Sequence, residues 1–263
     1  MPPSMSPSTQ HGTTTSADGT ALAWTRQGSG PTVVLVEPVM THRGYSALGE
    51  LPAALARRLT VVTYDRRGRG ESGGVDTHAD DSYDPRREVE DLAALVAEHG
   101  GTAALYGFSS GATLALRAAR DLGGTVTAVV ATEPARDVDP DIRPELRRLV
   151  DAGRRVEAIR LFNRHIGIPE DVVAQLPTGP AEPSAHTITH DLTVIRETPV
   201  SSYGQIGCPV LVLLSQGSQE PLAGWARETA AVVPGAELRV LPGGWHGLEP
   251  GPLVEAVSEF LRR

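Results

Sequence analysis

The stretch TAALYGFSSGATLALRAARDL, residues 102–122, predicts a buried β-strand, a tight turn and an α-helix in direct succession. Residues 102–107 form a short, largely apolar run, which is typical of a strand covered on both faces of a sheet. From residue 112 onward the apolar residues recur at helical spacing instead. Gly107 and Gly111 lack a Cβ atom and therefore allow the chain to turn sharply between the two elements.

Strands and helices alternate regularly on both sides of this stretch. The predicted strands cover residues 20–27, 32–38, 59–65, 102–107, 125–132, 209–215 and 236–242. The predicted helices cover residues 46–58, 84–99, 110–121, 221–233 and 253–262. Regular alternation of this kind predicts an α/β fold, with a mostly parallel central sheet and helices on both of its faces.

The alternation is interrupted once. Residues 135–205 are rich in Arg and Pro and contain helical segments but no convincing strand, so we interpret them as a helical insertion. Residues 19–134 and 206–263 then form one core domain. Residues 1–18 are rich in Ser, Thr and Pro, and we predict that they form a disordered tail.

The composition excludes several classes of protein. The chain has 263 residues, and its 24 basic residues are all arginine. Without lysine there is no Schiff-base residue for a pyridoxal enzyme or a lysine-dependent aldolase, and no P-loop lysine. The net charge of −8 argues against sequence-independent binding to nucleic acid. No apolar run approaches the roughly 20 residues of a membrane-spanning helix, so we expect no membrane partner.

The single cysteine and the N-terminus bear on metal binding and location. Cys208 cannot form an internal disulfide, and its place before the apolar run of residues 209–215 is typical of a packed small side chain. No Cys/His spacing suggests a zinc site, and we expect neither a metal nor a cofactor. The N-terminal residues lack the basic start and the apolar segment of a secretory signal, so we expect a cytoplasmic protein.

The turn at the centre of the opening stretch carries the chemistry. GFSSG, residues 107–111, fits the pattern G-x-S-x-G with Ser109 at its centre. Chance matches to so short a pattern are common, but this one joins a buried strand to an apolar-periodic helix. A nucleophile elbow requires that setting, because the turn exposes a serine hydroxyl at the carboxyl end of the sheet. Ser109 is therefore the candidate nucleophile, and a helix N-cap is the alternative role.

A serine nucleophile needs a base, and His246 is the candidate. It lies in LPGGWHGLEP, residues 241–250, between the last predicted strand and the last helix. A loop there returns to the carboxyl edge of the sheet, where Ser109 is expected. His99 ends a helix, where the partial negative charge suits an imidazolium, so a structural role explains it. Three further histidines lie in the insertion and could at most line a pocket: His165, His186 and His190.

These features together resemble the α/β-hydrolase fold superfamily. The resemblance rests on the element order, the elbow YGFSSG, the late GGWHG and the turn YDRRGRGES, and it extends from about residue 19 to the end. It implies the α/β-hydrolase fold and makes residues 135–205 a helical cap. The turn resembles the family pattern D-x-R-G-x-G-x-S at Asp65, Arg67, Gly68, Gly70 and Ser72. Since that turn is structural in the family, we assign Arg67 no catalytic role.

The resemblance also implies an acid that orients the histidine. Most members carry it after the next-to-last strand, where this chain reads LLSQGSQEPL, with Glu220 as the nearby carboxylate. A smaller group carries it after the strand that follows the elbow, and there the chain has Glu133. A carboxylate at that position could accept the Nδ1–H of His246 and fix its tautomer, so we predict Glu133 over Glu220. The absence of any acid and two further carboxylates stay open: Glu37 and Asp137.

An oxyanion hole requires two backbone N–H donors. Ser110 follows the nucleophile at a helix N-terminus, and its N–H is the first expected donor. The family usually takes the second from the residue after a His-Gly pair, but this chain reads EPVM, with Glu37 and Pro38 in that place. By position the second donor is Val39, with Met40 as the fallback.

We expect the substrate to lie between the edge of the sheet and the cap. Glu37 would place a carboxylate near the site, where it could bind a polar substrate group. The predicted apolar walls of the pocket are Met40, Tyr45, Phe108 and Trp245. Phe162 is a further candidate, although its place on a helical face favours a core role.

The predicted function is hydrolysis of a small ester, thioester or lactone through an acyl-enzyme. A serine at the elbow argues against epoxide hydrolases and haloalkane dehalogenases, which use an aspartate in this family. Two other classes stay open. One is a cofactor-free cyclase, lyase or acyltransferase, which the unusual EPVM loop supports, and the other is a small-ligand-binding protein with vestigial activity. The expected partner is a small-molecule substrate, and a homodimer is compatible with the sequence.

Overall fold

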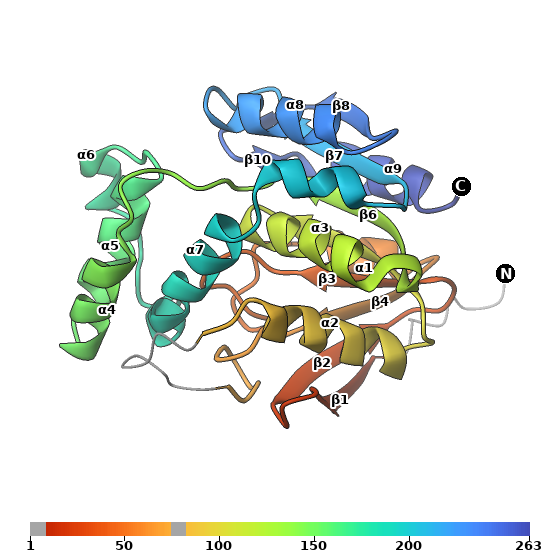
Figure 1. The fold of residues 1–263 in the computed structure, drawn as a ribbon, viewed down its shortest axis with the longest axis horizontal. Helices are drawn as coiled ribbons and strands as arrows, with labels where there is room; N and C mark the ends of the chain where they lie inside the picture. Colours follow the sequence, from red (N-terminus) through yellow and green to blue (C-terminus); the bar gives the residue numbers. More distant parts are fainter. Residues whose placement is uncertain (1–8, 75–82) are drawn as a thin grey trace, which may run out of the picture.

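The computed structural model describes residues 9–74 and 83–263. A central sheet is flanked by helices on both faces, and a further group of helices stands at one end of it (Figure 1). The strand order in the sheet is β1-β2-β4-β3-β5-β6-β7-β8. β1 and β2 run antiparallel to their neighbours, whereas all pairs from β4 to β8 are parallel. The predicted fold class, a mostly parallel sheet between helices, is confirmed.

The elements alternate much as the sequence predicts. The strands are β1 Gln10–Thr15, β2 Ala21–Gln27, β3 Thr32–Val36, β4 Thr60–Tyr64, β5 Ala103–Phe108, β6 Val126–Thr132, β7 Val210–Ser215, β8 Glu237–Leu241, β9 Gly243–Gly244 and β10 Gly247–Leu248. The α-helices are α1 Leu51–Leu55, α2 Arg86–Glu98, α3 Ser110–Leu122, α4 Arg143–Asp151, α5 Arg155–His165, α6 Glu170–Val173, α7 Ile188–Arg196, α8 Leu222–Val232 and α9 Pro250–Phe260. Three 3₁₀ segments complete them: η1 Gly123–Thr125, η2 Glu182–Thr187 and η3 Val200–Gln205.

Two apolar clusters lie on the two faces of the sheet. One face packs against α2, α3 and α8 through residues such as Leu92, Leu114 and Ala226. The other face packs against α1 and α9 through residues such as Leu55 and Val257. Strands in the middle of a sheet covered on both sides have no solvent-facing row, which is why β3 and β7 read as unbroken apolar runs.

The N-terminal part of the chain differs from the prediction. Of the supposed tail 1–18, residues 1–8 lie outside the described residues, but residues 10–15 form β1. β1 pairs with β2 in an antiparallel hairpin from Gln10↔Arg26 to Thr15↔Ala21, so the prediction of disorder is wrong there. The segment is polar because it is an edge strand, and its threonines favour extended backbone.

The first predicted core helix, residues 46–58, is shorter than expected. Only Leu51–Leu55 is helical, with a proline in the first turn. The preceding residues are engaged elsewhere, because Ser46 Oγ and Ala47 N–H both donate to the carboxylate of Glu37. These two hydrogen bonds hold residues 46–47 as a loop against the end of β3.

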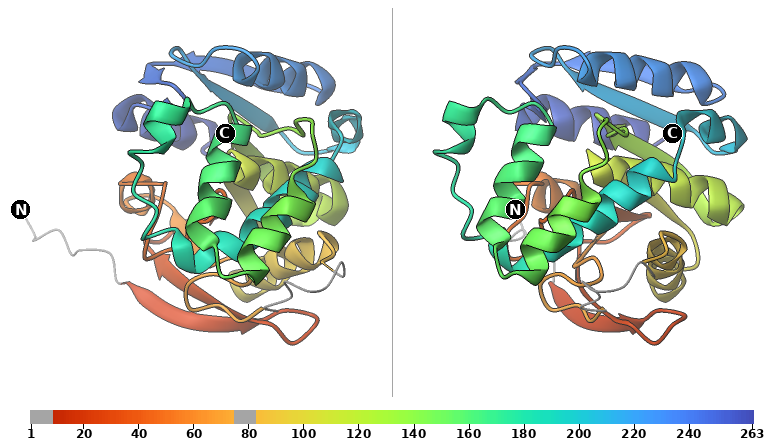
Figure 2. Two further views of the ribbon diagram at one scale, coloured as in Figure 1. Left: turned by 90° about the vertical axis from the view of Figure 1, so that its left-hand side faces the viewer. Right: turned by 60° about the vertical axis from the view of Figure 1, so that its left-hand side comes forward.

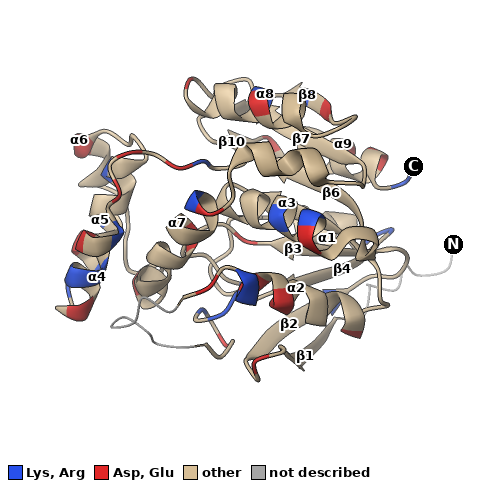
Figure 3. Cartoon of the chain, viewed as in Figure 1, with Lys and Arg blue, Asp and Glu red and all other residues tan. Residues whose placement is uncertain are grey.

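Residues 135–205 fold into a group of helices, here named the cap, which stands at one end of the sheet and comes to the front when that end is turned toward the viewer (Figure 2). The first two helices of the insertion, α4 and α5, are separated at Gly153, which adopts a φ of +73°. Basic and acidic residues are interspersed along α4 and α5 (Figure 3). The cap has its own apolar cluster, which Met40 joins from the loop after β3. Its last part, however, packs with the core through Val194 and Tyr203, so the core begins before residue 206.

Candidate active site

Ser109 stands at a sharp turn between β5 and α3. Its backbone has φ +55° and ψ −121°, a conformation that residues with a side chain rarely adopt. The flanking glycines make this turn sterically feasible. A Cβ on Gly107 would lie 2.3 Å from the carbonyl oxygen of Gly111, and one on Gly111 would lie 2.3 Å from that of Val36. The motif therefore forms the strained strand–turn–helix junction that the sequence predicts.

His246 is presented by a short hairpin that the sequence analysis did not predict. β9 and β10 pair as Gly244↔Gly247, which leaves Trp245 and His246 at the tip. His246 has a φ of +49°, and its backbone N–H donates to Ser218 Oγ at 2.9 Å. This hydrogen bond ties the hairpin tip to the loop after β7 and fixes the direction of the imidazole.

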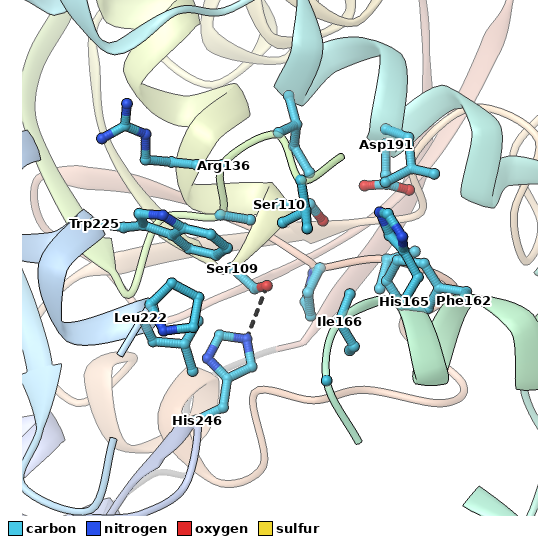
Figure 4. Close-up of a pocket in the computed structure, with 18 of the residues that line it drawn as sticks. Ser109, Ser110, Arg136, Phe162, His165, Ile166, Asp191, Leu222, Trp225 and His246 are labelled. Carbon is cyan, nitrogen blue, oxygen red and sulfur yellow. Dashed lines mark hydrogen bonds between the residues drawn. The ribbon is translucent and has the colours of Figure 1, made fainter. Parts of the chain in front are cut away.

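The three predicted catalytic side chains lie in one hydrogen-bonded chain. Ser109 Oγ is 2.9 Å from His246 Nε2, as the dashed line in Figure 4 shows. His246 Nδ1 is 2.7 Å from Glu133 Oε2 on the other side of the ring. The nucleophile, base and acid of the prediction therefore occupy the relative positions that nucleophilic catalysis by a serine requires.

The environment of Glu133 keeps its carboxyl ionised. Glu133 is buried, and burial by itself raises the pKa of a carboxyl group. Hydrogen bonds from His246, from the Ser218 hydroxyl and from the Ser215 N–H outweigh this and leave the pKa below its ordinary value. The Ser215 N–H donates at 2.9 Å. Glu133 is therefore a fixed anion beside His246 Nδ1.

The alternative acids are engaged elsewhere. Glu220 lies at the start of α8, where its carboxylate accepts the Gly224 N–H and pairs with Arg227. Asp137 pairs with Arg196 at the surface. Among the described residues, the structure thus brings Glu133 to His246 and gives these two carboxylates other partners.

Glu37 does not face the pocket, contrary to the prediction. It is buried and accepts hydrogen bonds from Thr41 Oγ1, Ser46 Oγ and Ala47 N–H. Burial raises the pKa of its carboxyl, although these hydrogen bonds act in the opposite direction. The role of Glu37 is to hold the loop after β3, because its carboxylate joins that loop to residues 46–47.

A cavity of about 300 Å³ lies between Ser109 and the cap. Pro38, Val39 and the first residue of α3 line it, so both expected oxyanion donors border the same space as the nucleophile. Its walls are mostly apolar, and the side chains come from the core and from the cap. The apolar wall residues are Pro38, Val39, Phe108, Ala135, Val138, Phe162, Ile166, Leu192, Ile195, Pro221, Leu222, Trp225 and Trp245.

The predicted pocket residues divide into two groups. Phe108 and Trp245 line the cavity, and so does Phe162, which is at the same time part of the cap cluster. Met40 and Tyr45 do not line it, because they pack into the cap cluster. Both residues lie in the segment that follows β3. The chain turns at Met40, whose φ is +61°, and the two side chains pack against the cap rather than the cavity.

Two charged residues around the cavity, Arg136 and Asp191, have partners of their own. His165 lines it, whereas His186 and His190 do not. In Figure 4 the guanidinium of Arg136 points away from Ser109, and it pairs with Glu228. Asp191 forms part of the wall but is held by two buried arginines, Arg66 and Arg69.

The pairing of these two arginines with Asp191 was not predicted from the sequence. Arg66 and Arg69 lie in the turn after β4 and reach across to α7, more than 120 residues away in sequence. Arg67 between them binds Asp91 and Asp18 instead, in agreement with a structural role. Three arginines in five residues beside an apolar strand were the available signal, because such a cluster is either solvated or paired with buried carboxylates.

Two structural features are absent from residues 9–74 and 83–263. No helix there is both long and apolar enough to cross a membrane. No group of three or more His, Cys, Asp or Glu side chains in these ranges is arranged to hold a metal ion.

Comparison with known proteins agrees with this architecture. An alpha/beta hydrolase from Sphaerobacter thermophilus is 36% identical, with a TM-score of 0.86 over 95% of this chain and all of that one. An enol-lactonase from Burkholderia xenovorans is 18% identical, with a TM-score of 0.73 over 94% of this chain and 98% of the other. An esterase from Thermogutta terrifontis is 23% identical, with a TM-score of 0.72 over 96% and 98%. The latter two share the fold.

The family assignment rests on the sequence as a whole. Residues 16–261 match the alpha/beta hydrolase family, which is nearly the entire chain and includes the elbow, the turn after β4 and the His246 hairpin. Together with the fold, this match shows that the chain belongs to the alpha/beta hydrolase family.

Proposed function

We propose that this protein is a serine hydrolase that cleaves a small ester, thioester or lactone through an acyl-enzyme. The hydrogen-bonded chain from Ser109 through His246 to Glu133, at the base of a mostly apolar cavity, carries the proposal. Membership in the alpha/beta hydrolase family supports hydrolase activity. The esterase and the enol-lactonase of the same fold make esters and lactones the first substrates to test.

The proposed reaction follows from the positions of these groups. His246 Nε2 accepts the proton of Ser109 Oγ as the oxygen attacks the substrate carbonyl. Glu133 accepts the Nδ1–H, which keeps the correct tautomer and stabilises the imidazolium that forms. His246 then returns the proton to the leaving oxygen or sulfur, and the acyl group stays on Ser109. A water molecule, deprotonated by His246, attacks the acyl-enzyme and releases the acid.

The negative charge that develops on the carbonyl oxygen of the substrate needs hydrogen-bond donors that point at this oxygen. Ser110 is the first residue of α3, and the N–H groups of a first helical turn have no acceptor within the helix. They also carry the positive end of the helix dipole. Ser110 N–H and Val39 N–H are the proposed oxyanion donors, since both residues border the cavity beside Ser109.

The cavity favours an apolar acyl group of moderate size. Leu222, Trp225 and Ile166 surround the space in front of Ser109 in Figure 4, and Trp225 is the largest of the three. A volume of about 300 Å³ holds a short aliphatic or a single aromatic group rather than a long fatty chain. Among p-nitrophenyl esters, we expect kcat/KM to be highest for short to medium chains and to fall for long ones.

Active-site labelling tests the proposal directly. A fluorophosphonate probe forms a covalent bond with a serine that is activated by a neighbouring base. We expect it to label the wild type at Ser109, with no labelling of S109A and with hydrolysis of p-nitrophenyl esters abolished in that variant. Wild-type protein that is folded but neither labels nor turns over any ester, thioester or lactone in a panel would contradict the proposed function.

A further inference from the structure

We propose that Arg69 is a positioning residue for catalysis, which orients and polarises the Val39 N–H of the oxyanion hole. This inference rests on the proposed function, because it assigns a partner to one of its two oxyanion donors. It concerns a residue in the turn after β4 that touches neither the triad nor the cavity.

One peptide group links Arg69 to the proposed oxyanion donor. The carbonyl of Pro38 and the N–H of Val39 belong to the same peptide unit, and a trans peptide holds these two groups on opposite sides of a rigid plane. Whatever fixes the carbonyl therefore fixes the direction of the N–H. Arg69 Nη1 donates to the Pro38 oxygen at 2.6 Å, and to the Thr41 oxygen at 3.3 Å. The guanidinium thus holds this peptide plane from the side away from Val39 N–H.

The charge of Arg69 adds a second effect. A charged donor on a carbonyl oxygen withdraws electron density from the whole peptide group, so that the N–H on its other end becomes a stronger donor. In a site shielded from water, the electrostatic attraction between the polarised N–H and the oxyanion is strong, because the low dielectric constant screens this attraction only weakly. Arg69 is buried, as is its carboxylate partner Asp191.

The position of Arg69 itself is fixed in three directions. Its Nε donates to Thr187 Oγ1 at 3.0 Å, and its Nη2 pairs with Asp191 Oδ2 on α7 of the cap. Arg66 pairs with the other oxygen of Asp191 at 2.6 Å and with Glu88 on α2. Two buried guanidinium groups thus face two buried carboxylates. The network joins the cap to the loop that carries Val39.

Within residues 9–74 and 83–263, Arg69 is the charged donor to the Pro38 carbonyl, whereas Arg66 donates to the preceding carbonyl, that of Glu37, at 3.2 Å. The family pattern places His-Gly here, whereas this chain has Glu37 and Pro38. The Glu37 carboxylate binds Thr41, Ser46 and Ala47, which secures the loop but leaves the Pro38 carbonyl to other donors. Besides Arg69, that oxygen has Thr41 as its neighbour, with Thr41 Oγ1 at 2.9 Å.

A matched control lies two residues away. Arg67 is also buried and forms a bidentate pair with a buried carboxylate, Asp91, but it contacts α2 and Asp18 rather than the loop after β3. R67M and R69M therefore remove comparable buried ion pairs, and only R69M removes the charged donor from the Pro38 carbonyl, which keeps its contact with Thr41. A merely structural role for Arg69 predicts similar effects of the two substitutions on both activity and stability.

The test compares the two variants in ester hydrolysis and in backbone hydrogen exchange. We expect R69M to lower kcat at least tenfold with KM changed less than threefold, because the donor acts mainly on the transition state. Amides of residues 39–41 should exchange faster in R69M than in R67M. R67M should keep kcat within twofold of the wild type, even if its melting temperature falls by as much as that of R69M. Equal kcat values and equal exchange rates in the two variants would overturn the inference.

A milder variant covers the case in which R69M does not fold. T187V removes the oxygen that accepts Arg69 Nε without removing the charge, and we expect a two- to fivefold loss in kcat with faster exchange at residues 39–41. Unchanged values of both in T187V would equally overturn the role of Arg69. The two proposals fail in different ways. A wild type without turnover contradicts the hydrolase, whereas an active wild type with R69M equal to R67M contradicts Arg69 alone.

Discussion

The carboxylate of Glu133 connects His246 to the end of the neighbouring strand: Oε2 lies 2.7 Å from His246 Nδ1, and Oε1 accepts the Ser215 N–H at 2.9 Å. Glu133 follows β6, which lies between β5 with the nucleophile and β7 with Ser215. The backbone N–H at the end of β7 thus supports a carboxylate that comes from β6. This arrangement explains how the loop after β7 can lack an aspartate without leaving His246 unpaired.

The first prediction concerns the acid. E133Q keeps the shape of the side chain but removes the negative charge that orients and stabilises the imidazolium. We expect kcat for a p-nitrophenyl ester to fall by about 10²–10⁴. D137N serves as the matched control, since Asp137 pairs with Arg196 at the surface and should keep kcat within twofold. A larger loss in E220Q than in E133Q would move the acid to Glu220.

Ser218 gives a second and smaller prediction. Its oxygen accepts the His246 N–H at 2.9 Å, and its hydroxyl also helps to keep the pKa of Glu133 low. S218A should therefore loosen the hairpin tip, and we expect a three- to tenfold loss in kcat with the triad still present. S202A, a substitution of the same kind at a half-buried serine of η3 whose hydroxyl donates to the Pro199 carbonyl, should leave kcat unchanged. Steady-state kinetics of S218A and S202A measure these two expected effects, and an equal kcat in the two variants would contradict the role of Ser218.

The fold and the three side chains of the hydrogen-bonded chain, which we propose as the triad, could be predicted from the sequence because each depends on a local pattern. Ser109 follows a strand within a glycine motif, and Glu133 and His246 follow strands whose apolar runs are easy to recognise. The structure adds that all three have a positive φ, together with Met40. The residue types at these positions do not predict a strained backbone. Such strain is common at functional sites and is maintained by the surrounding contacts.

The remaining part of the site could not be predicted, because it depends on how distant segments meet. Glu37 was assigned to the pocket from its place in the chain, yet its partners are Thr41 and Ser46 in its own loop. The contact of Arg69 with Asp191 spans 122 residues and depends on how the cap sits on the core. No periodicity or motif specifies such a pairing.

A third prediction tests the buried ion pairs through stability. Glu88 is buried and accepts two hydrogen bonds from Arg66, which lower the pKa of its carboxyl to about 2 although burial alone would raise it. E88Q should cost about 3 kcal/mol of unfolding free energy at pH 7, because the buried Arg66 loses one of its two charged partners and keeps only Asp191. E90Q, at an exposed pair with Arg87, should cost less than about 1 kcal/mol.

The difference between E88Q and the wild type should depend on pH. The stabilisation by ionised Glu88 is fully present above the ordinary glutamate pKa of about 4.5 and is lost as the pH falls toward 2. Urea unfolding should therefore give nearly the same difference at pH 7 and pH 5, a smaller one at pH 4 and a much smaller one at pH 3. A difference that stays constant down to pH 3 would assign the stability loss to altered packing rather than to charge.

The last prediction concerns His190, whose burial within α7 makes it a source of acid sensitivity. Its ring stacks on Tyr83 with centroids 4.0 Å apart, and burial lowers the pKa of the imidazole to about 3 although Glu88 and Asp191 act in the opposite direction. The unfolded chain binds a proton at this residue below about pH 6.5, whereas the folded chain does not until about pH 3. The stability that comes from keeping His190 neutral is therefore complete above pH 6.5 and is lost as the pH falls from 6.5 toward 3.

H190F isolates this contribution, because phenylalanine preserves the stacking on Tyr83 but cannot bind a proton. Within the described part of the chain His190 Nδ1 has no hydrogen-bond partner, so the substitution breaks no bond at that atom. We expect wild type and H190F to have similar unfolding free energies at pH 8. Between pH 6 and 4 the wild type should lose up to about 1.4 kcal/mol per pH unit more than H190F, as one proton bound only by the unfolded state requires. Parallel stability curves for the two proteins over that range would exclude His190 as the titrating group, since the ring would then be protonated in both the folded and the unfolded chain.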